Sequence, residues 1–171
     1  MCIGTKPYKQ EHTVDLETEA IFSSEINHGN ESDDNTLLDS VITAQGNVQQ
    51  ADSQAEIREA VGDKGYHKNE TLAKCRMDEL RTYICEPDSP NRRWTDKPAH
   101  YEAAYCDNRR RLKGDCNKCL QKLRSERVES SFAHVCETVG ARRTWLRGLE
   151  NNRKKVRLVV ATHNYPEKTA G

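Results

Sequence analysis

Two acidic residues, Asp63 and Glu129, occupy positions from which a carboxylate could bind a metal ion. Asp63 ends the short β-prone run at the start of "VGDKGYHKNE", and sites in open α/β sheets gather outside the carboxyl ends of strands. Carboxylates from two different elements suit Mg²⁺ chemistry on phosphates, in which two ions about 4 Å apart activate water and stabilise the leaving oxygen. The alternative for Asp63 is an ordinary turn residue, and periodicity alone does not show that the two acids meet.

Glu129 belongs to a segment, residues 126–139, with the period of an amphipathic helix. At about 100° per residue, one face of this helix gathers an apolar stripe. The members of the stripe are Val128, Phe132, Val135, Cys136 and Val139. Glu129 is expected at the edge of the stripe, where a carboxylate costs desolvation energy unless it is paired or binds a cation. The alternative to a cation is an ion pair with Arg124 or Arg127.

The zero net charge of the 171 residues conceals a strong polarity along the chain. Residues 1–63 carry 3 Lys/Arg against 13 Asp/Glu, whereas residues 64–171 carry 24 against 14, so the two parts have net charges of −10 and +10. Arginines of the basic part cluster in "NRRRLK", "ARRTWLRG" and "NNRKKVR". Together these clusters favour a nucleic-acid partner, because each phosphate neutralised releases counterions. The alternative for any one cluster is a solvated helix face.

The seven cysteines are expected to be free thiols, since their number is odd and the first ten residues lack the apolar stretch of a signal peptide. Cys116 and Cys119 in "CNKC" have the spacing of half a zinc site, but the other cysteines are scattered singly. A structural zinc is therefore disfavoured. With 35% apolar residues and no run near the roughly 18 that span a bilayer, we expect one cytosolic domain with a modest core and no membrane partner.

The first half of the chain has the pattern of an α/β domain. Residues 11–26 alternate loosely around a polar "DLET", which predicts a β-hairpin. Residues 36–54 have helical spacing and are expected to fray at Gly46. A short strand candidate at 56–63, a helix at 68–79 and a strand at 80–86 then complete a β-α-β unit.

The second half is mostly helical. Three prolines within residues 87–98 predict an exposed connection without regular structure. Residues 99–139 are nearly all helix formers, interrupted only at Gly114, and residues 144–164 resume the helical period after "GARR". These helices must position Glu129 and the basic clusters.

Two segments resemble bacterial insertion-sequence DDE transposases. "VGDKGYHKNETL" followed by "RTYI" is similar to their second-aspartate segment: an acid, a basic residue, Gly-Tyr, a helix and a strand. The stretch from "SERVESSFAHV" to "VVATHN" is similar to their glutamate segment: Val-Glu, a Phe three residues after the Glu, a Gly-x-Arg-Arg turn, an Arg-Gly pair and a helix ending in His-Asn. The resemblance also runs through "KPYKQEHTVDLETEAI" and covers nearly the whole chain.

The resemblance implies Asp63 as the second catalytic aspartate and Glu129 as the catalytic glutamate, both holding Mg²⁺ or Mn²⁺ for DNA strand cleavage and strand transfer at transposon ends. It also implies an RNase H-like fold. Lys64 and Tyr66 are candidates for placing DNA, with a core aromatic as the alternative for Tyr66. The implied DNA contacts beyond the glutamate helix are Arg142, Arg143, Trp145 and Arg147. Their alternative is a solvated arginine face with Trp145 packed inward.

The chain departs from the family at its start. The first catalytic aspartate of the family lies on a strand before the segment where this chain begins, and Asp15 in "HTVDLET" matches a non-catalytic hairpin position. We therefore expect a C-terminal transposase piece: an α/β, RNase H-like domain over residues 1–164, incomplete because the first strand and its aspartate are missing, with C-terminal helices and a disordered tail at 165–171.

Such a piece is expected to be weak or inactive alone, and an inactive remnant is one reading of it. Its partners would be transposon-end and target DNA, with homo-oligomers possible in the full-length family and association with the bacterial nucleoid when on DNA. The alternative function is a small basic nucleic-acid-binding protein without catalysis.

Overall fold

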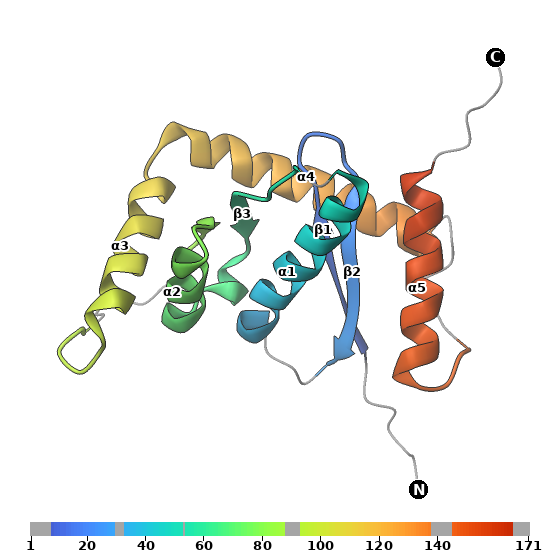
Figure 1. The fold of residues 1–171 in the computed structure, drawn as a ribbon, viewed down its shortest axis with the longest axis horizontal. Helices are drawn as coiled ribbons and strands as arrows, with labels where there is room; N and C mark the ends of the chain where they lie inside the picture. The colour runs from blue at the N-terminus through green and yellow to red at the C-terminus, as the bar shows by residue number, and fades with distance from the viewer. Residues whose placement is uncertain (1–7, 30–32, 53, 88–92, 138–144, 166–171) are drawn as a thin grey trace, which may run out of the picture. The chain divides into compact units, whose positions relative to one another are not determined.

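The computed structural model describes residues 8–29, 33–52, 54–87, 93–137 and 145–165, which form a mixed α/β fold (Figure 1). The strands are β1 (Tyr8–Val14), β2 (Ile21–His28), β3 (Glu59–Gly62) and β4 (Arg81–Ile84). The helices are α1 (Asp33–Ala51), α2 (Asn69–Met77), α3 (Ala99–Leu112), α4 (Asp115–Glu137) and α5 (Leu149–Asn164). The chain divides into two compact units, residues 32–125 and residues 1–31 with 126–171. We call them the β-α-β unit and the hairpin unit.

The β-α-β unit contains the parallel pair β3–β4, in which Glu59 faces Arg81 and Gly62 faces Ile84. Parallel strands need a crossover connection, and α2 supplies it. The apolar faces of α1, α2 and α3 cover one core with the strands. Its buried members are Leu37, Val41, Leu72, Ala73, Cys75, Leu80, Ile84 and Ala104.

Side chains of α3 bind the backbone of β4. The amide of Asn108, fully buried, accepts from the Ile84 N–H at 3.1 Å and donates to the Ile84 carbonyl at 2.9 Å. The Arg111 guanidinium donates to the Thr82 carbonyl at 2.9 Å. These bonds satisfy backbone groups that a neighbouring strand would otherwise have to pair.

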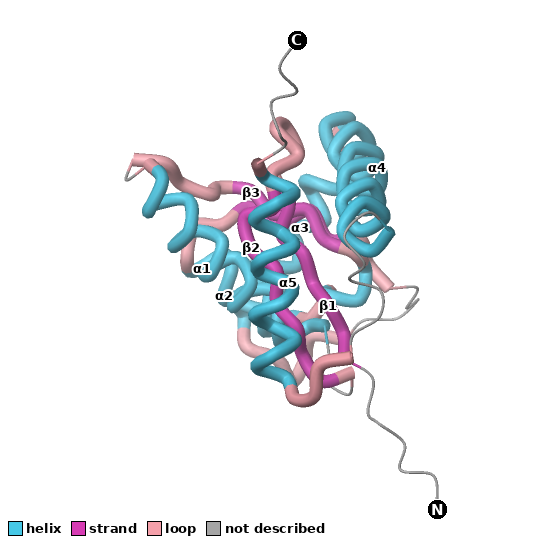
Figure 2. The backbone as a smooth tube through the Cα atoms, turned by 90° about the vertical axis from the view of Figure 1, so that its right-hand side faces the viewer, coloured by secondary structure: helices cyan, strands magenta, loops and turns pink. Residues whose placement is uncertain are grey.

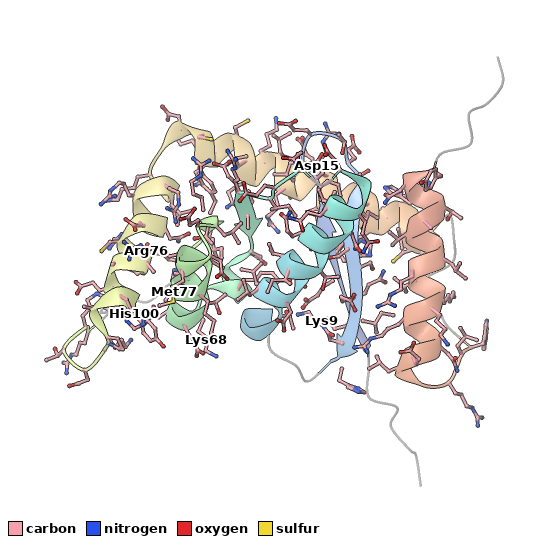
Figure 3. All side chains as sticks on the ribbon, in the orientation of Figure 1. Lys9, Asp15, Lys68, Arg76, Met77 and His100 are labelled. Atoms are coloured by element: carbon pink, nitrogen blue, oxygen red, sulfur yellow. The ribbon has the colours of Figure 1, made fainter. Side chains whose placement is uncertain are left out.

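The hairpin unit is built on the antiparallel pair β1–β2, whose register shifts between Thr13 and Val14. Asp15, labelled in Figure 3, closes the turn, since its carboxylate accepts from the Thr18 N–H at 2.9 Å. Glu19 in the same turn has a left-handed backbone with φ 65°, a conformation that is costly for a residue with a side chain. An ion pair and hydrogen bond from Arg127 on α4 hold this glutamate in place.

Helix α5 lies along β2 in the hairpin unit, as Figure 2 shows from the side. The buried residues of this core are Ile21, Ile26, Val135, Val156, Val159 and Val160. At the end of α5, the Asn164 amide accepts from the Ile21 N–H at 2.9 Å and donates to the Ile21 carbonyl at 2.8 Å. His12 on β1 stacks flat on Phe132 of α4, with ring centroids 4.1 Å apart.

The predicted hairpin, the parallel β-α-β pair and the helix break at Gly114 are confirmed. The predicted fraying at Gly46 is wrong: α1 runs through this glycine to Ala51. Glycine costs a helix only roughly 1 kcal/mol, and the Gln45 side chain next to it bonds the Ala55 carbonyl and the Ile57 N–H, which fastens the end of α1 to the following segment. The last helix begins at Leu149, later than the pattern predicted, because Gly148 has φ 87°, outside the helical range.

Candidate functional site

Asp63 directly follows β3, at the carboxyl edge of the parallel pair, as the sequence predicted. Its backbone is extended and its side chain is exposed. One carboxylate oxygen accepts from the Lys64 N–H at 2.7 Å, and the Asp63 carbonyl accepts from the Tyr66 N–H at 3.1 Å, which starts a short 3₁₀ turn over Lys64–Tyr66. Asp63 is thus a turn-capping residue whose carboxylate still faces solvent, and Lys64 beside it is also exposed.

Gly62 and Tyr66 fix the direction in which the chain leaves β3. A Cβ on Gly62 would lie 3.3 Å from Cγ1 of Ile84 and 3.6 Å from Cδ2 of Tyr66, so the strand end is closely packed. Tyr66 is half-buried and packs against the core of its unit. The structure therefore favours the core alternative for Tyr66 over a role in placing DNA.

Glu86 is a second acid at the same edge, two residues beyond the end of β4, and the sequence analysis missed it. Its carboxylate accepts from the Tyr105 hydroxyl at 2.6 Å and forms an ion pair with Arg109 at 3.4 Å. The available signal was an acid close behind "RTYI", as Asp63 is behind "EAVG", although Glu86 comes one residue later after its strand than Asp63 does. Because both oxygens of Glu86 have protein partners, this acid is less open to a metal ion than Asp63.

Glu129 lies on α4, but not at a buried edge as expected. Its side chain is exposed, whereas Ser131 and Val135 are the buried residues of this helix. Val128, Phe132 and the thiol-bearing Cys136 of the predicted stripe are half-buried, and Val139 lies outside the described residues. The expectation that Glu129 is partly buried beside the apolar stripe is therefore wrong, because the residue is exposed.

The two acids belong to different compact units, Asp63 to the β-α-β unit and Glu129 to the hairpin unit. In the described part of the chain, no group of three or more His, Cys, Asp or Glu side chains is arranged to hold a metal ion. Cys116 and Cys119 are both exposed near the start of α4.

The turn before α5 presents Trp145 and Arg147 to solvent. Trp145 is 92% exposed, which excludes the alternative in which it packs inward. The buried Asn152 side chain donates to the Leu146 carbonyl at 3.2 Å and to the Gly148 carbonyl at 2.7 Å, so the turn is anchored to the first turn of α5. Arg142 and Arg143, the other predicted DNA contacts, lie outside the described residues.

The arginines of "NRRRLK" on α3 are engaged within the protein. Arg109 pairs with Glu86, and Arg110 pairs with Asp107 at 3.2 Å. Arg111 binds the Thr82 backbone, and burial lowers the pKa of its guanidinium. Arg109 and Arg110 remain exposed, so for these two the structure is consistent with the alternative of a solvated helix face, with partners on the protein itself.

The cluster "NNRKKVR" on α5 is divided between structural and exposed charges. Arg153 donates to the Ile26 carbonyl at 3.2 Å, and Arg157 lies 3.7 Å from Glu25. Lys154 is exposed on the same helix. The exposure of Lys154 could not be predicted from the sequence, because nothing in the cluster distinguishes this lysine from its neighbours that are paired within the protein.

No helix in the described ranges has the length and apolar character needed to cross a membrane.

The family model described as "Transposase DDE domain" matches residues 47–167 of this chain. The matched span contains both Asp63 and Glu129. Comparison with curated proteins and with solved structures gives no match.

Proposed function

Because the chain belongs to the transposase DDE domain family, we propose that it acts on DNA in transposition, by strand cleavage and strand transfer at insertion-sequence ends. The observation that carries the proposal is the family match across residues 47–167. This span contains Asp63 and Glu129, which the resemblance of their two segments implies as the second aspartate and the glutamate. We propose these two residues as the metal-binding acids. The parallel β3-α2-β4 unit, with Asp63 at its carboxyl edge, supports an RNase H-like fold.

The donor chemistry of the two acids fits a hard divalent cation. Both side chains are exposed carboxylates, and Mg²⁺ binds oxygen ligands while keeping several waters. Bound Mg²⁺ or Mn²⁺ would supply an activated water and stabilise the leaving oxygen in phosphodiester transfer. The Lys64 N–H holds one carboxylate oxygen of Asp63 in a fixed orientation. The other oxygen is left toward solvent, where it could bind the ion.

The anchored turn at Trp145–Arg147 supports DNA contact in the hairpin unit. The Asn152 bonds hold the backbone of this turn, so the exposed indole and guanidinium are presented at low entropic cost. Arginine pairs with phosphate, and an exposed aromatic ring can stack on a base. Lys154 adds a positive charge on the adjacent helix.

The test separates metal binding from DNA binding in the full chain. Asp63→Asn and Glu129→Gln keep side-chain size and remove charge, so we expect each to weaken Mn²⁺ binding by about tenfold, or about 1.4 kcal/mol. Mn²⁺ electron paramagnetic resonance measures this affinity. Asp15→Asn is the matched control, because Asp15 also caps a turn by accepting a backbone N–H but matches a non-catalytic position of the family's hairpin.

DNA binding is measured by fluorescence anisotropy on a duplex carrying an insertion-sequence end. We expect Trp145→Ala with Arg147→Ala to weaken binding several-fold, with a shallower salt dependence, and the acid variants to leave affinity unchanged. Any Mn²⁺-dependent strand cleavage must disappear in both acid variants. Cleavage that survives Asp63→Asn, or Mn²⁺ binding equal in all proteins, would contradict the proposal; salt-dependent DNA binding alone would then favour a binding protein without catalysis.

A further inference from the structure

Two histidines of the hairpin unit bring their ring nitrogens together. His134 on α4 and His163 on α5 have Nδ1 atoms 3.0 Å apart, with ring centroids separated by 4.9 Å and ring planes inclined by 59°. As a hydrogen bond, this contact requires one ring to donate an Nδ1–H to the bare Nδ1 of the other. With the shared proton removed, the same short separation would also let both Nδ1 atoms bind an ion at one common point.

A metal ion can occupy that point. With metal–nitrogen bonds of about 2.0–2.1 Å, nitrogens separated by 3.0 Å subtend roughly 90° at the ion. This is the angle between adjacent ligands in the square-planar and octahedral coordination that Ni²⁺ and Cu²⁺ adopt, and imidazole is a preferred ligand for Ni²⁺, Cu²⁺ and Zn²⁺. We propose that His134 and His163 form a binding site for a divalent transition-metal ion of this imidazole-preferring class, linking α4 to α5.

The neighbours of both histidines hold the pair in place. Val135, next to His134, is fully buried in the core of the hairpin unit, and Val159 and Val160 bury the same face of α5 one turn before His163. Asn164, immediately after His163, binds both backbone groups of Ile21. The backbones that carry the two rings are therefore fixed by packing and hydrogen bonds, and little ordering remains to be done when an ion binds.

The site is open, so water completes the coordination. His134 is exposed and His163 is half-buried, which gives an ion direct access from solvent. The described part of the chain offers no cluster with a third His, Cys, Asp or Glu ligand, so a hard cation such as Mg²⁺, which requires oxygen ligands, is not bound here. Burial and the neighbouring His134 lower the pKa of His163, and the neutral imidazole is the form that binds a metal ion.

The probe for the test is Ni²⁺ alone, added to the full chain without an affinity tag. Calorimetry should give one Ni²⁺ bound per chain, and the ring signals assigned to His134 and His163 should broaden first in proton–carbon NMR spectra. At saturating Ni²⁺ we expect the hairpin unit to melt roughly 3–8 °C higher, and a chelator should reverse this shift.

His134→Ala and His163→Ala should each abolish the stoichiometric site. His100→Ala is the matched control: this exposed histidine on α3, labelled in Figure 3, packs edge-to-face with Tyr101 and belongs to the other unit. A second control, Cys116→Ser with Cys119→Ser, removes the exposed thiol pair as a competing ligand set. Both controls should bind Ni²⁺ as the unaltered chain does.

Equal Ni²⁺ binding by the His163→Ala protein, or the absence of broadening at both rings, would overturn the proposal and leave the pair as a hydrogen bond. Circular dichroism of each variant reports whether it folds. If a variant does not fold, the NMR broadening in the unaltered chain still tests whether Ni²⁺ binds at the two rings. Failure here is distinct from failure of the transposition proposal, because Asp63→Asn and Glu129→Gln should leave Ni²⁺ binding intact.

Discussion

In each of the two units, an asparagine side chain on a helix pairs the backbone N–H and carbonyl of a strand residue, but the two asparagines differ in burial. In the β-α-β unit, Asn108 pairs both backbone groups of Ile84, and in the hairpin unit Asn164 pairs both backbone groups of Ile21. Asn108 is fully buried, whereas Asn164 is exposed at the end of α5. Ile21 itself is buried like Ile84, but removing the exposed Asn164 side chain should open its backbone to solvent. We therefore expect water to replace the lost bonds at Ile21 and nothing to replace them at Ile84.

The largest effect is expected at Asn108. Asn108→Ala leaves the N–H and carbonyl of Ile84 buried without partners, and at about 1–3 kcal/mol for each unsatisfied group the free energy of unfolding should fall by about 2–5 kcal/mol. Hydrogen exchange of the Ile84 amide measures the loss locally, and Trp94 fluorescence follows unfolding of this unit. A loss below about 1 kcal/mol would mean that water reaches the edge of β4, and the contrast between the units would fail.

The next effect is a pH dependence confined to the hairpin unit. Burial lowers the pKa of His12 from 6.5 to about 4, with a smaller contribution from His163. The unfolded chain binds the proton more tightly, so this contribution to stability is complete above pH 6.5 and is lost as the pH falls toward 4. The loss over that window amounts to roughly 3 kcal/mol.

The measurement for His12 is urea unfolding at pH 7 and pH 4.5, compared between the unaltered chain and His12→Phe. Phenylalanine can keep the stack on Phe132 and does not titrate, so the difference between the two proteins isolates His12 from carboxylates that titrate in both. An equal pH dependence in the two proteins would show that His12 is hydrated in the folded state.

The smallest effect is expected at Asn164. Asn164→Ala should lower the free energy of unfolding by only about 0.5–1.5 kcal/mol, the net value of exposed hydrogen bonds whose partners can turn to water. The Ile21 amide should exchange faster, while the Ile84 amide stays unchanged. A loss as large as that of Asn108→Ala would show that the exposure of Asn164 does not decide the cost.

Local patterns predicted the elements but not the long-range contacts. The hairpin, the β-α-β unit and the break at Gly114 follow from alternation, helical period and turn residues, all of which act over a few positions. The bonds from Asn164 to Ile21 span 143 residues, and those from Asn108 to Ile84 span 24. No periodicity marks which asparagine will meet a strand, so these residues could not be chosen from the sequence.

The candidate site was predictable in part for the same reason. The position of Asp63 directly after β3 could be predicted, because a short β-prone run that ends in Gly-Asp is a local signal for the end of a strand. The exposure of Glu129 depends on which face of α4 meets the hairpin, and the helical period gives the apolar stripe but not how far its edge is covered. The open turn at Trp145 likewise depends on the tertiary anchoring by Asn152.

The bonds from α3 to β4 also determine where this small sheet can be extended. Successive residues of a strand turn their backbone groups to alternate edges, and Thr82 and Ile84 share the edge that Arg111 and Asn108 occupy. A strand from another chain cannot pair with that edge unless it displaces the Arg111 and Asn108 side chains. These side chains therefore protect β4 from edge-to-edge aggregation. The sheet can therefore grow in one direction only: an added strand would have to join at β3, the strand that Asp63 directly follows.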